Sequence, residues 1–187
     1  MGKITKLVLA SQVAFLVLIG ACVVITPHFL FSRDEGGMSN YGVHASTVVF
    51  YTLAFVTSAG LLLLAARALP KAPDFRSLRR IFVITAYSLL LVLLTTYPYK
   101  HSNTYGNIHT LANIWTFCFQ MYAGVWLALF FRRNIITSLL LLAQFAAFVL
   151  VVLTFIGTIH LLFVAQILTL LAYGSLLVTS TIEPVNN

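Results

Sequence analysis

The sequence has 187 residues, of which 60% are hydrophobic and 8% are charged. Soluble globular domains carry about 25% charged residues, so this composition excludes an ordinary water-soluble domain. The formal net charge is +7, from 11 Lys and Arg residues against 4 Asp and Glu residues, but no soluble nucleic-acid-binding motif accompanies it. We therefore expect a membrane protein that binds no nucleic acid.

Long apolar segments follow one another along the chain. A spanning helix needs about 20 mostly apolar residues, and six such segments cover residues 7–26, 46–66, 81–97, 109–131, 135–155 and 159–180. None has Asp, Glu, Lys or Arg in its interior, which argues against ion pumping. Backbone polar groups in lipid must be paired within the chain, which favours helices. The sequence predicts an all-α integral membrane bundle of six transmembrane helices, forming a single domain over residues 1–187.

Most of the positive charges fall on one side of the expected helices. If the N-terminus is cytoplasmic, nine of the 11 lie on the cytoplasmic side: Lys3, Lys6, Arg67, Lys71, Arg76, Arg79, Arg80, Arg132 and Arg133. Arg33 and Lys100 lie on the other side with all five histidines. Short loops rich in Lys and Arg stay cytoplasmic, so we expect cytoplasmic termini and extracytoplasmic histidine-bearing loops. No further targeting segment is seen, which favours a prokaryotic plasma membrane.

Polar stripes run along three of the expected helices. Spacings of four, three and four residues place one set on a single face: His109, Asn113, Thr116 and Gln120. The second helix has a similar stripe of His44, Thr47, Tyr51 and Ser58, and the sixth has Gln166, Thr169, Tyr173 and Ser180. Such side chains are often packing contacts between helices, but they could also line a cleft. The candidate ligand-binding residues are His44, Tyr51, His109, Asn113, Thr116 and Gln120.

The longest outer loop, residues 27–45, is also the most polar. Its Gly36-Gly37 pair favours a turn, so we expect the loop to fold back over the helix ends. Together with the second outer loop it supplies further polar candidates: Arg33, Asp34, Glu35, Ser39, Asn40 and His101.

Two kinds of hydrolytic chemistry are open to these residues. Histidines and carboxylates in one aqueous layer could bind a divalent metal, and the candidate ligands are His44, His101, His109 and His160. No pair has His-x3-His spacing, so such ligands would have to converge from several loops. Alternatively, Ser39 or Ser46 could pair with a histidine base, with Asp34 orienting it; the candidate bases are His44, His101 and His109. No Gly-x-Ser-x-Gly element is present.

Three short motifs lie near the outer ends of the expected helices. They are Ser39-Asn40-Tyr41-Gly42 before the second helix, Tyr97-Pro98 after the third, and Ile108-His109 at the start of the fourth. With its six spans and loop proportions, the chain resembles the six-span Frag/DRAM/Sfk-like membrane proteins and their uncharacterised prokaryotic relatives, the domain-of-unknown-function family 998. The resemblance implies a six-helix membrane fold. Some eukaryotic members are associated with lipid-anchor remodelling, autophagy or membrane-lipid organisation, and most prokaryotic members lack an assigned activity.

The leading hypothesis is a multi-pass protein that binds a lipid or other amphiphile in an outward-facing cleft, with His44 and His109 at its mouth. One alternative is a metal-assisted lipid hydrolase at the outer leaflet, with a divalent metal as cofactor. Another is a scaffold subunit of a membrane complex. Membrane lipids are the expected partners, and the sequence identifies no protein partner.

Overall fold

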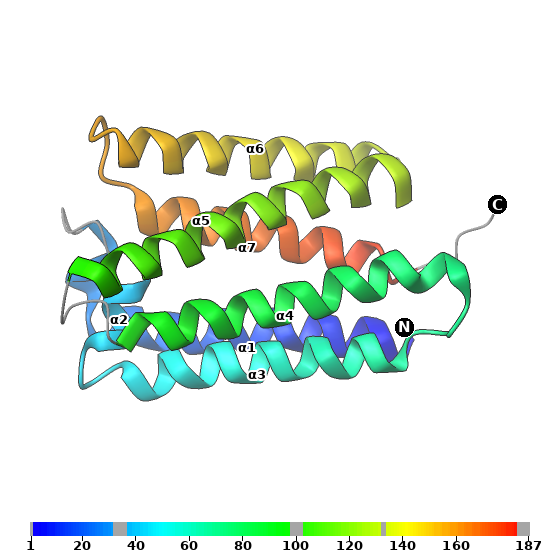
Figure 1. The fold of residues 1–187 in the computed structure, drawn as a ribbon, viewed down its shortest axis with the longest axis horizontal. Helices are drawn as coiled ribbons and strands as arrows, with labels where there is room; N and C mark the ends of the chain where they lie inside the picture. Colours follow the sequence, from blue (N-terminus) through cyan, green and yellow to red (C-terminus); the bar gives the residue numbers. More distant parts are fainter. Residues whose placement is uncertain (1, 32–36, 98–102, 132–133, 183–187) are drawn as a thin grey trace.

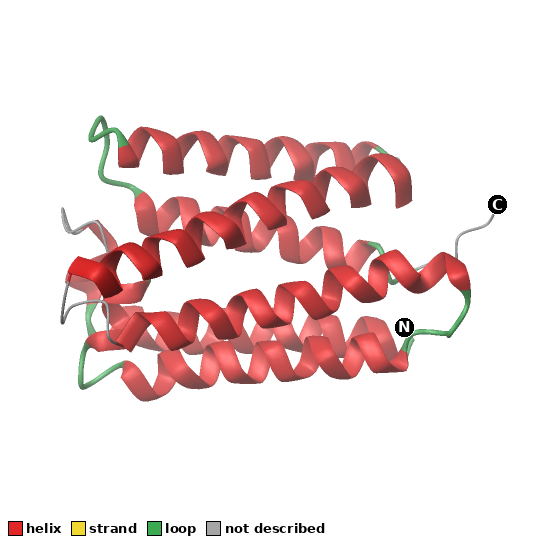
Figure 2. Cartoon of the chain, viewed as in Figure 1, coloured by secondary structure: helices red, strands yellow, loops and turns green. Residues whose placement is uncertain are grey.

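The computed structural model describes residues 2–31, 37–97, 103–131 and 134–182. Over these ranges the chain is helical and has no strand (Figure 2). Six long helices run side by side, and the short helix α2 lies across one end of the bundle (Figure 1). The helices are α1 (Lys3–Ile25), α2 (Ser39–Val43), α3 (Val48–Ala68), α4 (Arg76–Thr96), α5 (Asn103–Trp126), α6 (Ile135–Phe155) and α7 (Leu162–Thr179). Short 3₁₀ turns cover Pro27–Phe31 and Pro73–Phe75, and a π-helical turn, Leu127–Phe131, continues α5.

Five segments of the described chain are long and apolar enough to cross a membrane. They comprise α1, α3, α6, α7 and the segment Pro73–Thr96 that contains α4. The prediction of an all-helical, multi-pass membrane protein is confirmed to that extent. Helix α5 has 24 residues but is not among the five, because polar residues such as His109, Asn113 and Gln120 lower its hydropathy.

Some helices begin before the apolar segments that predict them, whereas α6 coincides with its predicted segment and α7 lies within its own. Helix α1 begins at Lys3 and α4 begins at Arg76, each several residues before the apolar run. Hydropathy marks only the lipid-facing part of a helix, whereas backbone hydrogen bonding continues into the polar interface.

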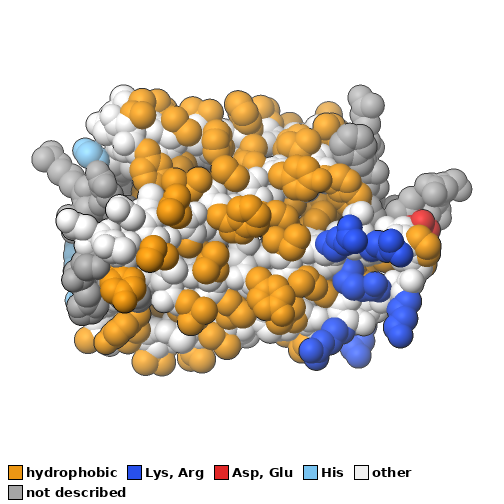
Figure 3. Space-filling view, viewed as in Figure 1, with side chains coloured by type: hydrophobic (Ala, Val, Ile, Leu, Met, Phe, Trp, Pro, Cys, Tyr) orange, Lys and Arg blue, Asp and Glu red, His pale blue; other side chains and the backbone are white. Residues whose placement is uncertain are grey.

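The surface of the bundle is apolar along its middle. Val24, Leu94 and Ile135 are each at least 75% exposed, and Figure 3 shows hydrophobic side chains over the centre of one face. The described Lys and Arg residues gather at one end, here called the basic end: Lys3, Lys6, Arg67, Lys71, Arg76, Arg79 and Arg80. The four described histidines lie toward the opposite end, here called the histidine end: His28, His44, His109 and His160. Arg132 and Arg133 lie outside the described residues.

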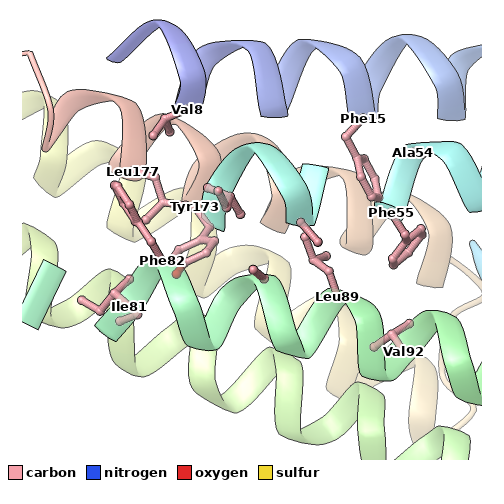
Figure 4. Packing of buried hydrophobic residues seen from close by; sticks show 14 of the residues in the cluster. Val8, Phe15, Ala54, Phe55, Ile81, Phe82, Leu89, Val92, Tyr173 and Leu177 are labelled. Carbon is pink, nitrogen blue, oxygen red and sulfur yellow. The ribbon is translucent and has the colours of Figure 1, made fainter. Parts of the chain in front are cut away.

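Helices that follow one another in sequence pack against one another. Helix α1 packs against α3, α3 against α4, α4 against α5 and α6 against α7, while contacts between α1 and α7 close the bundle. The seam between α1 and α3 is held by two reciprocal bonds, from Ser11 Oγ to the Ser58 carbonyl at 3.1 Å and from Ser58 Oγ to the Ser11 carbonyl at 2.8 Å. Figure 4 shows aromatic and aliphatic side chains from α1, α3, α4 and α7 meeting at the centre, among them Phe15, Leu89 and Tyr173.

A buried glutamine joins α6 to α5. Gln144 is fully buried, and its Nε2 donates to the Gln120 carbonyl at 2.7 Å. Its side chain lies against Gly124, where a Cβ would overlap the Gln144 amide. The missing side chain at Gly124 therefore allows α6 to reach the α5 backbone, and it fixes the α5 turn that carries Gln120.

Candidate functional site

Helix α2 covers the histidine end of the bundle. Its first four residues are buried: Ser39, Asn40, Tyr41 and Gly42. The chain enters it through Gly37, whose φ of 52° is in the region that favours glycine. The next residue, Met38, donates its backbone N–H to Gln166 Oε1 of α7 at 2.7 Å. The second half of the first outer loop, from Gly37 onward, thus lies over the helix ends, as expected from the sequence.

Two further contacts fix α2 against its neighbours. The Tyr41 ring packs edge-on against Phe29 and Phe163, with centroids 5.4 and 5.7 Å away. Gly42 lies so close to α3 and α4 that a Cβ there would meet Thr96 Cγ2 at 2.5 Å and the Tyr51 ring at 2.7 Å. A glycine is therefore required where this helix crosses the bundle.

His109 lies beneath α2 and links three elements. Its Nε2 lies 2.8 Å from Ser39 Oγ of α2, and its Nδ1 lies 2.9 Å from Thr95 Oγ1 of α4. Asn113 Nδ2, one turn further along α5, lies 3.0 Å from the same Nε2 and donates to the His109 carbonyl at 3.1 Å. Ser39 and His109 are 2% and 5% exposed, so the contact between them is shielded from bulk water, whereas Thr95 and Asn113 are half-buried.

The neighbours of His109 determine its tautomer. Thr95 Oγ1 lies 3.0 Å from the carbonyls of both Leu91 and Val92, so its single hydrogen is directed to the helix backbone and its lone pairs accept from Nδ1–H. Asn113 supports the same assignment, because its N–H donor can face Nε2 only where that nitrogen is unprotonated. Nε2 therefore carries no proton, and its lone pair accepts from the Ser39 hydroxyl as well as from Asn113 Nδ2–H.

A cavity of about 60 Å³ lies at the centre of the bundle, directly below α2. Most of the surface that faces the cavity is apolar. Half of its lining residues are apolar: Phe15, Met38, Phe55, Leu89, Val92, Phe117 and Leu170. The other half is polar and uncharged: Ser39, Tyr51, Asn113, Thr116, Gln120, Gln166 and Thr169. No charged residue of the described chain lines it. These side chains come from α1, α2, α3, α4, α5 and α7, and the cavity is therefore formed only in the assembled bundle.

The structure brings most of the sequence-predicted ligand-binding residues to this cavity. Tyr51, Asn113, Thr116 and Gln120 line it, and His109 contacts two of its lining residues, Ser39 and Asn113.

His44 lies apart from the cavity. It is exposed, its Nδ1 lies 2.8 Å from Ser46 Oγ, and its ring lies beside those of His28 and Phe29. The structure therefore does not place His44 and His109 together at the mouth of a cleft, because α2 covers His109. Among the outer-loop candidates Asn40 is buried in α2. Four others lie outside the described residues: Arg33, Asp34, Glu35 and His101.

The described residues do not bring metal ligands together. They contain no group of three His, Cys, Asp or Glu side chains able to hold an ion. His160 is exposed before α7, His44 pairs with Ser46, and both ring nitrogens of His109 have hydrogen-bond partners. Within this part of the chain, His44, His109 and His160 thus do not form the expected metal site.

Sequence reasoning missed some residues of the site. Gln166 and Thr169 belong to a recognised stripe but were not predicted to bind ligand, although the same four-and-three spacing could have found them. Thr95 gave no signal, because its contact with His109 depends on how α4 packs against α5.

Comparisons with protein-family models, curated proteins and solved structures found no match. The fold and the site define an all-helical membrane protein whose central cavity is uncharged and combines apolar with polar side chains. The resemblance to the Frag/DRAM/Sfk-like proteins rests on the short motifs and loop proportions alone.

Proposed function

We propose that this protein is a six-span membrane protein that binds the uncharged polar group of an amphiphile in its central cavity. The observation that carries the proposal is the lining, which combines seven polar, uncharged side chains with seven apolar ones. Buried charge without a partner is strongly unfavourable, so a charged headgroup would not be stable there. Amide side chains can donate to an ester, an amide or an alcohol. The hydroxyls of Thr116 and Thr169 donate within their own helices and can accept from an amide or an alcohol.

The size of the cavity limits what enters it. A volume of about 60 Å³ equals roughly two shares of liquid water at about 30 Å³ each. This space suits a polar linkage with a few methylene groups, whereas pockets for whole drug-sized ligands span about 300–1,000 Å³. The hydrocarbon part of the ligand must therefore lie outside the cavity.

A groove on the bundle surface is suited to that hydrocarbon part. It has a volume of about 300 Å³ between α1 and α7, and its lining is mostly apolar, including Leu9, Val13 and Leu171. Leu170 lines both the groove and the central cavity. We infer that an acyl chain lies in this groove while its polar end passes Leu170 into the cavity.

The polar composition of α5 supports its role as the sixth span. Its buried residues include His109, Thr116 and Gln120, so these polar groups face the bundle interior and not lipid. The basic end is then cytoplasmic by the positive-inside rule, and α2 lies on the extracytoplasmic side of what we propose is a prokaryotic plasma membrane. Membership of the Frag/DRAM/Sfk-like family is part of the same proposal.

Matched threonine variants test the binding proposal. Thr116 and Thr154 both donate to the carbonyl four residues earlier in a long helix, but only Thr116 lines the cavity. Native mass spectrometry of the detergent-purified protein should detect a bound uncharged amphiphile. Because the Thr116 hydroxyl donates within its own helix, it can only accept a hydrogen bond from the ligand, for example from an alcohol O–H. Loss of that bond, worth about 1 kcal/mol, should lower the occupancy measured below saturation about fivefold in Thr116→Val and leave it unchanged in Thr154→Val. Equal occupancy in both variants, or no bound amphiphile in wild type, would contradict the proposal.

A further inference from the structure

We propose that Ser39 and His109 act as nucleophile and general base in transferring the acyl group of an uncharged carboxylic ester bound in the central cavity. This inference rests on the proposed function, because the ester must occupy the same cavity. Ser39 lines that cavity, and its Oγ lies 2.8 Å from His109 Nε2. A serine hydroxyl is a weak nucleophile until a base within hydrogen-bond reach takes its proton.

The base is held in the form that the reaction needs. His109 Nδ1–H donates to Thr95 Oγ1 at 2.9 Å, so Nε2 carries no proton and can accept the proton of Ser39 Oγ, 2.8 Å away. The orienting group is a hydroxyl whose own hydrogen is directed to the α4 backbone. The Thr95 hydroxyl therefore positions His109 as the carboxylate positions the histidine of a serine hydrolase triad, but it carries no negative charge.

Asn113 is placed to stabilise the developing negative charge. One of its Nδ2 hydrogens is directed to the His109 carbonyl at 3.1 Å, and the other to Nε2, 3.0 Å away. When Nε2 receives the Ser39 proton it becomes a donor, and this second N–H loses its acceptor. Asn113 also lines the cavity, so the released N–H becomes available to the carbonyl oxygen of the bound ester, as in an oxyanion hole.

The proposed reaction needs only the bound ester and water, or a second alcohol in place of water. Ser39 Oγ attacks the ester carbonyl carbon while its proton moves to His109 Nε2. The carbon–oxygen bond to the leaving alcohol then breaks, and His109 returns the proton to that alcohol. Water, or a second alcohol, attacks the acyl-serine in the same way and releases a carboxylic acid, or a new ester, with Ser39 restored.

The neutral orienting group predicts slow turnover. Removal of the aspartate alone from a serine protease triad lowers kcat by about 3 × 10⁴-fold, and Thr95 provides no charge to stabilise the imidazolium of His109. We therefore expect acyl transfer over hours, for which covalent trapping of the serine is a better readout than fast product release.

A second serine–histidine pair in the same protein provides the matched control. His44 Nδ1 and Ser46 Oγ also lie 2.8 Å apart, at the same end of the bundle, but His44 and Ser46 are exposed and do not line the cavity. Hydrogen bonding alone would give both pairs equal reactivity. The proposal requires that only the pair at the cavity reacts.

The test treats the full-length, detergent-purified chain with an alkyl fluorophosphonate, which phosphonylates an activated serine and releases fluoride. Peptide mass spectrometry should find the adduct on Ser39 and not on Ser46. Labelling should vanish in Ser39→Ala, fall at least tenfold in His109→Gln, which retains a hydrogen-bonding side chain but no base, and remain unchanged in His44→Gln. Thr95→Val should reduce the labelling rate while the α-helical circular dichroism spectrum is retained.

A dialkyl ether analogue of diacylglycerol, which has no carbonyl to attack, separates the two proposals. Binding of the ether together with labelling of Ser39 supports both. Binding of the ether with no adduct on Ser39, or with equal labelling in wild type and His109→Gln, overturns the acyl-transfer inference and leaves the binding function in place. Loss of ether binding in the wild type overturns both.

Discussion

Ser39 Oγ lies 2.8 Å from Nε2 of His109, although the two residues are 70 positions apart in the sequence. The contact joins the short cover helix α2 to a long helix of the bundle and lies at the edge of the central cavity. This hydrogen bond therefore joins α2, which covers the histidine end, to the cavity that we assign to ligand binding.

The stability of the fold should depend on His109. His109→Ala removes the partner of Ser39 and of Thr95, and polar contacts between membrane helices contribute about 0.6–1.7 kcal/mol each. We expect a loss of about 1–3 kcal/mol for the two contacts, measured as a lower midpoint of thermal unfolding in detergent. His44→Ala, at an exposed position of the same end, should leave the midpoint within about 1 °C of wild type if the loss is specific.

Substitution of Gly42 should displace α2. A Cβ at Gly42 would meet the Tyr51 ring at 2.7 Å and Thr96 Cγ2 at 2.5 Å, so Gly42→Ala should destabilise the protein by about 1–3 kcal/mol through overpacking. The matched change is Gly60→Ala in α3, where a Cβ meets nothing within 4 Å. That change should be neutral or slightly stabilising, because alanine favours a helix. Equal unfolding midpoints for the two variants would show that α2 does not pack as described.

The contact between Gly124 and Gln144 predicts a coupled pair of substitutions. Gly124→Ala should destabilise the protein, because its new methyl group overlaps the Gln144 amide. Gln144→Ala removes that amide together with its bond to the Gln120 carbonyl. In the double variant the overlap is gone. Its loss of unfolding free energy should therefore be smaller than the sum of the losses in the two single variants. Strict additivity in a double-mutant cycle would contradict the contact.

Accessibility to a membrane-impermeant maleimide tests the proposed orientation. In a chain whose Cys22 and Cys118 are replaced by Ala, single cysteines are introduced at two exposed positions, Ser46 at the histidine end and Lys71 at the basic end. The Ser46→Cys chain should be labelled in intact cells, and the Lys71→Cys chain only after lysis. The reverse pattern would show that the basic end faces outward.

Patterns that repeat along one helix were predictable from the sequence. The spacing of His109, Asn113, Thr116 and Gln120 placed them on one face of α5, and the structure directs this face toward the interior. Spacing cannot distinguish a cavity lining from a packing contact. Ser58 belongs to the stripe that includes Tyr51, yet it bonds to the α1 backbone and does not line the cavity.

Contacts between residues from different helices were not predictable from the sequence. The covered position of His109 follows from a five-residue helix in the first outer loop, which is too short to leave a periodic signal. The bond from Thr95 to His109 depends on the packing of α4 against α5. The separation of His44 from His109 likewise follows from where α2 crosses the bundle, since the sequence shows only that both histidines lie near one end.

The most direct test of the central claim is photocrosslinking with a diacylglycerol analogue that carries a diazirine next to an ester group. In native membranes the analogue should label peptides that contain Asn113 to Gln120 and Gln166 to Leu170, and unlabelled diacylglycerol should compete for these sites. At a concentration below saturation, labelling should fall about fivefold in Thr116→Val and remain at the wild-type level in Thr154→Val. Labelling confined to exposed residues of α6, or labelling that unlabelled lipid does not reduce, would contradict binding in the central cavity.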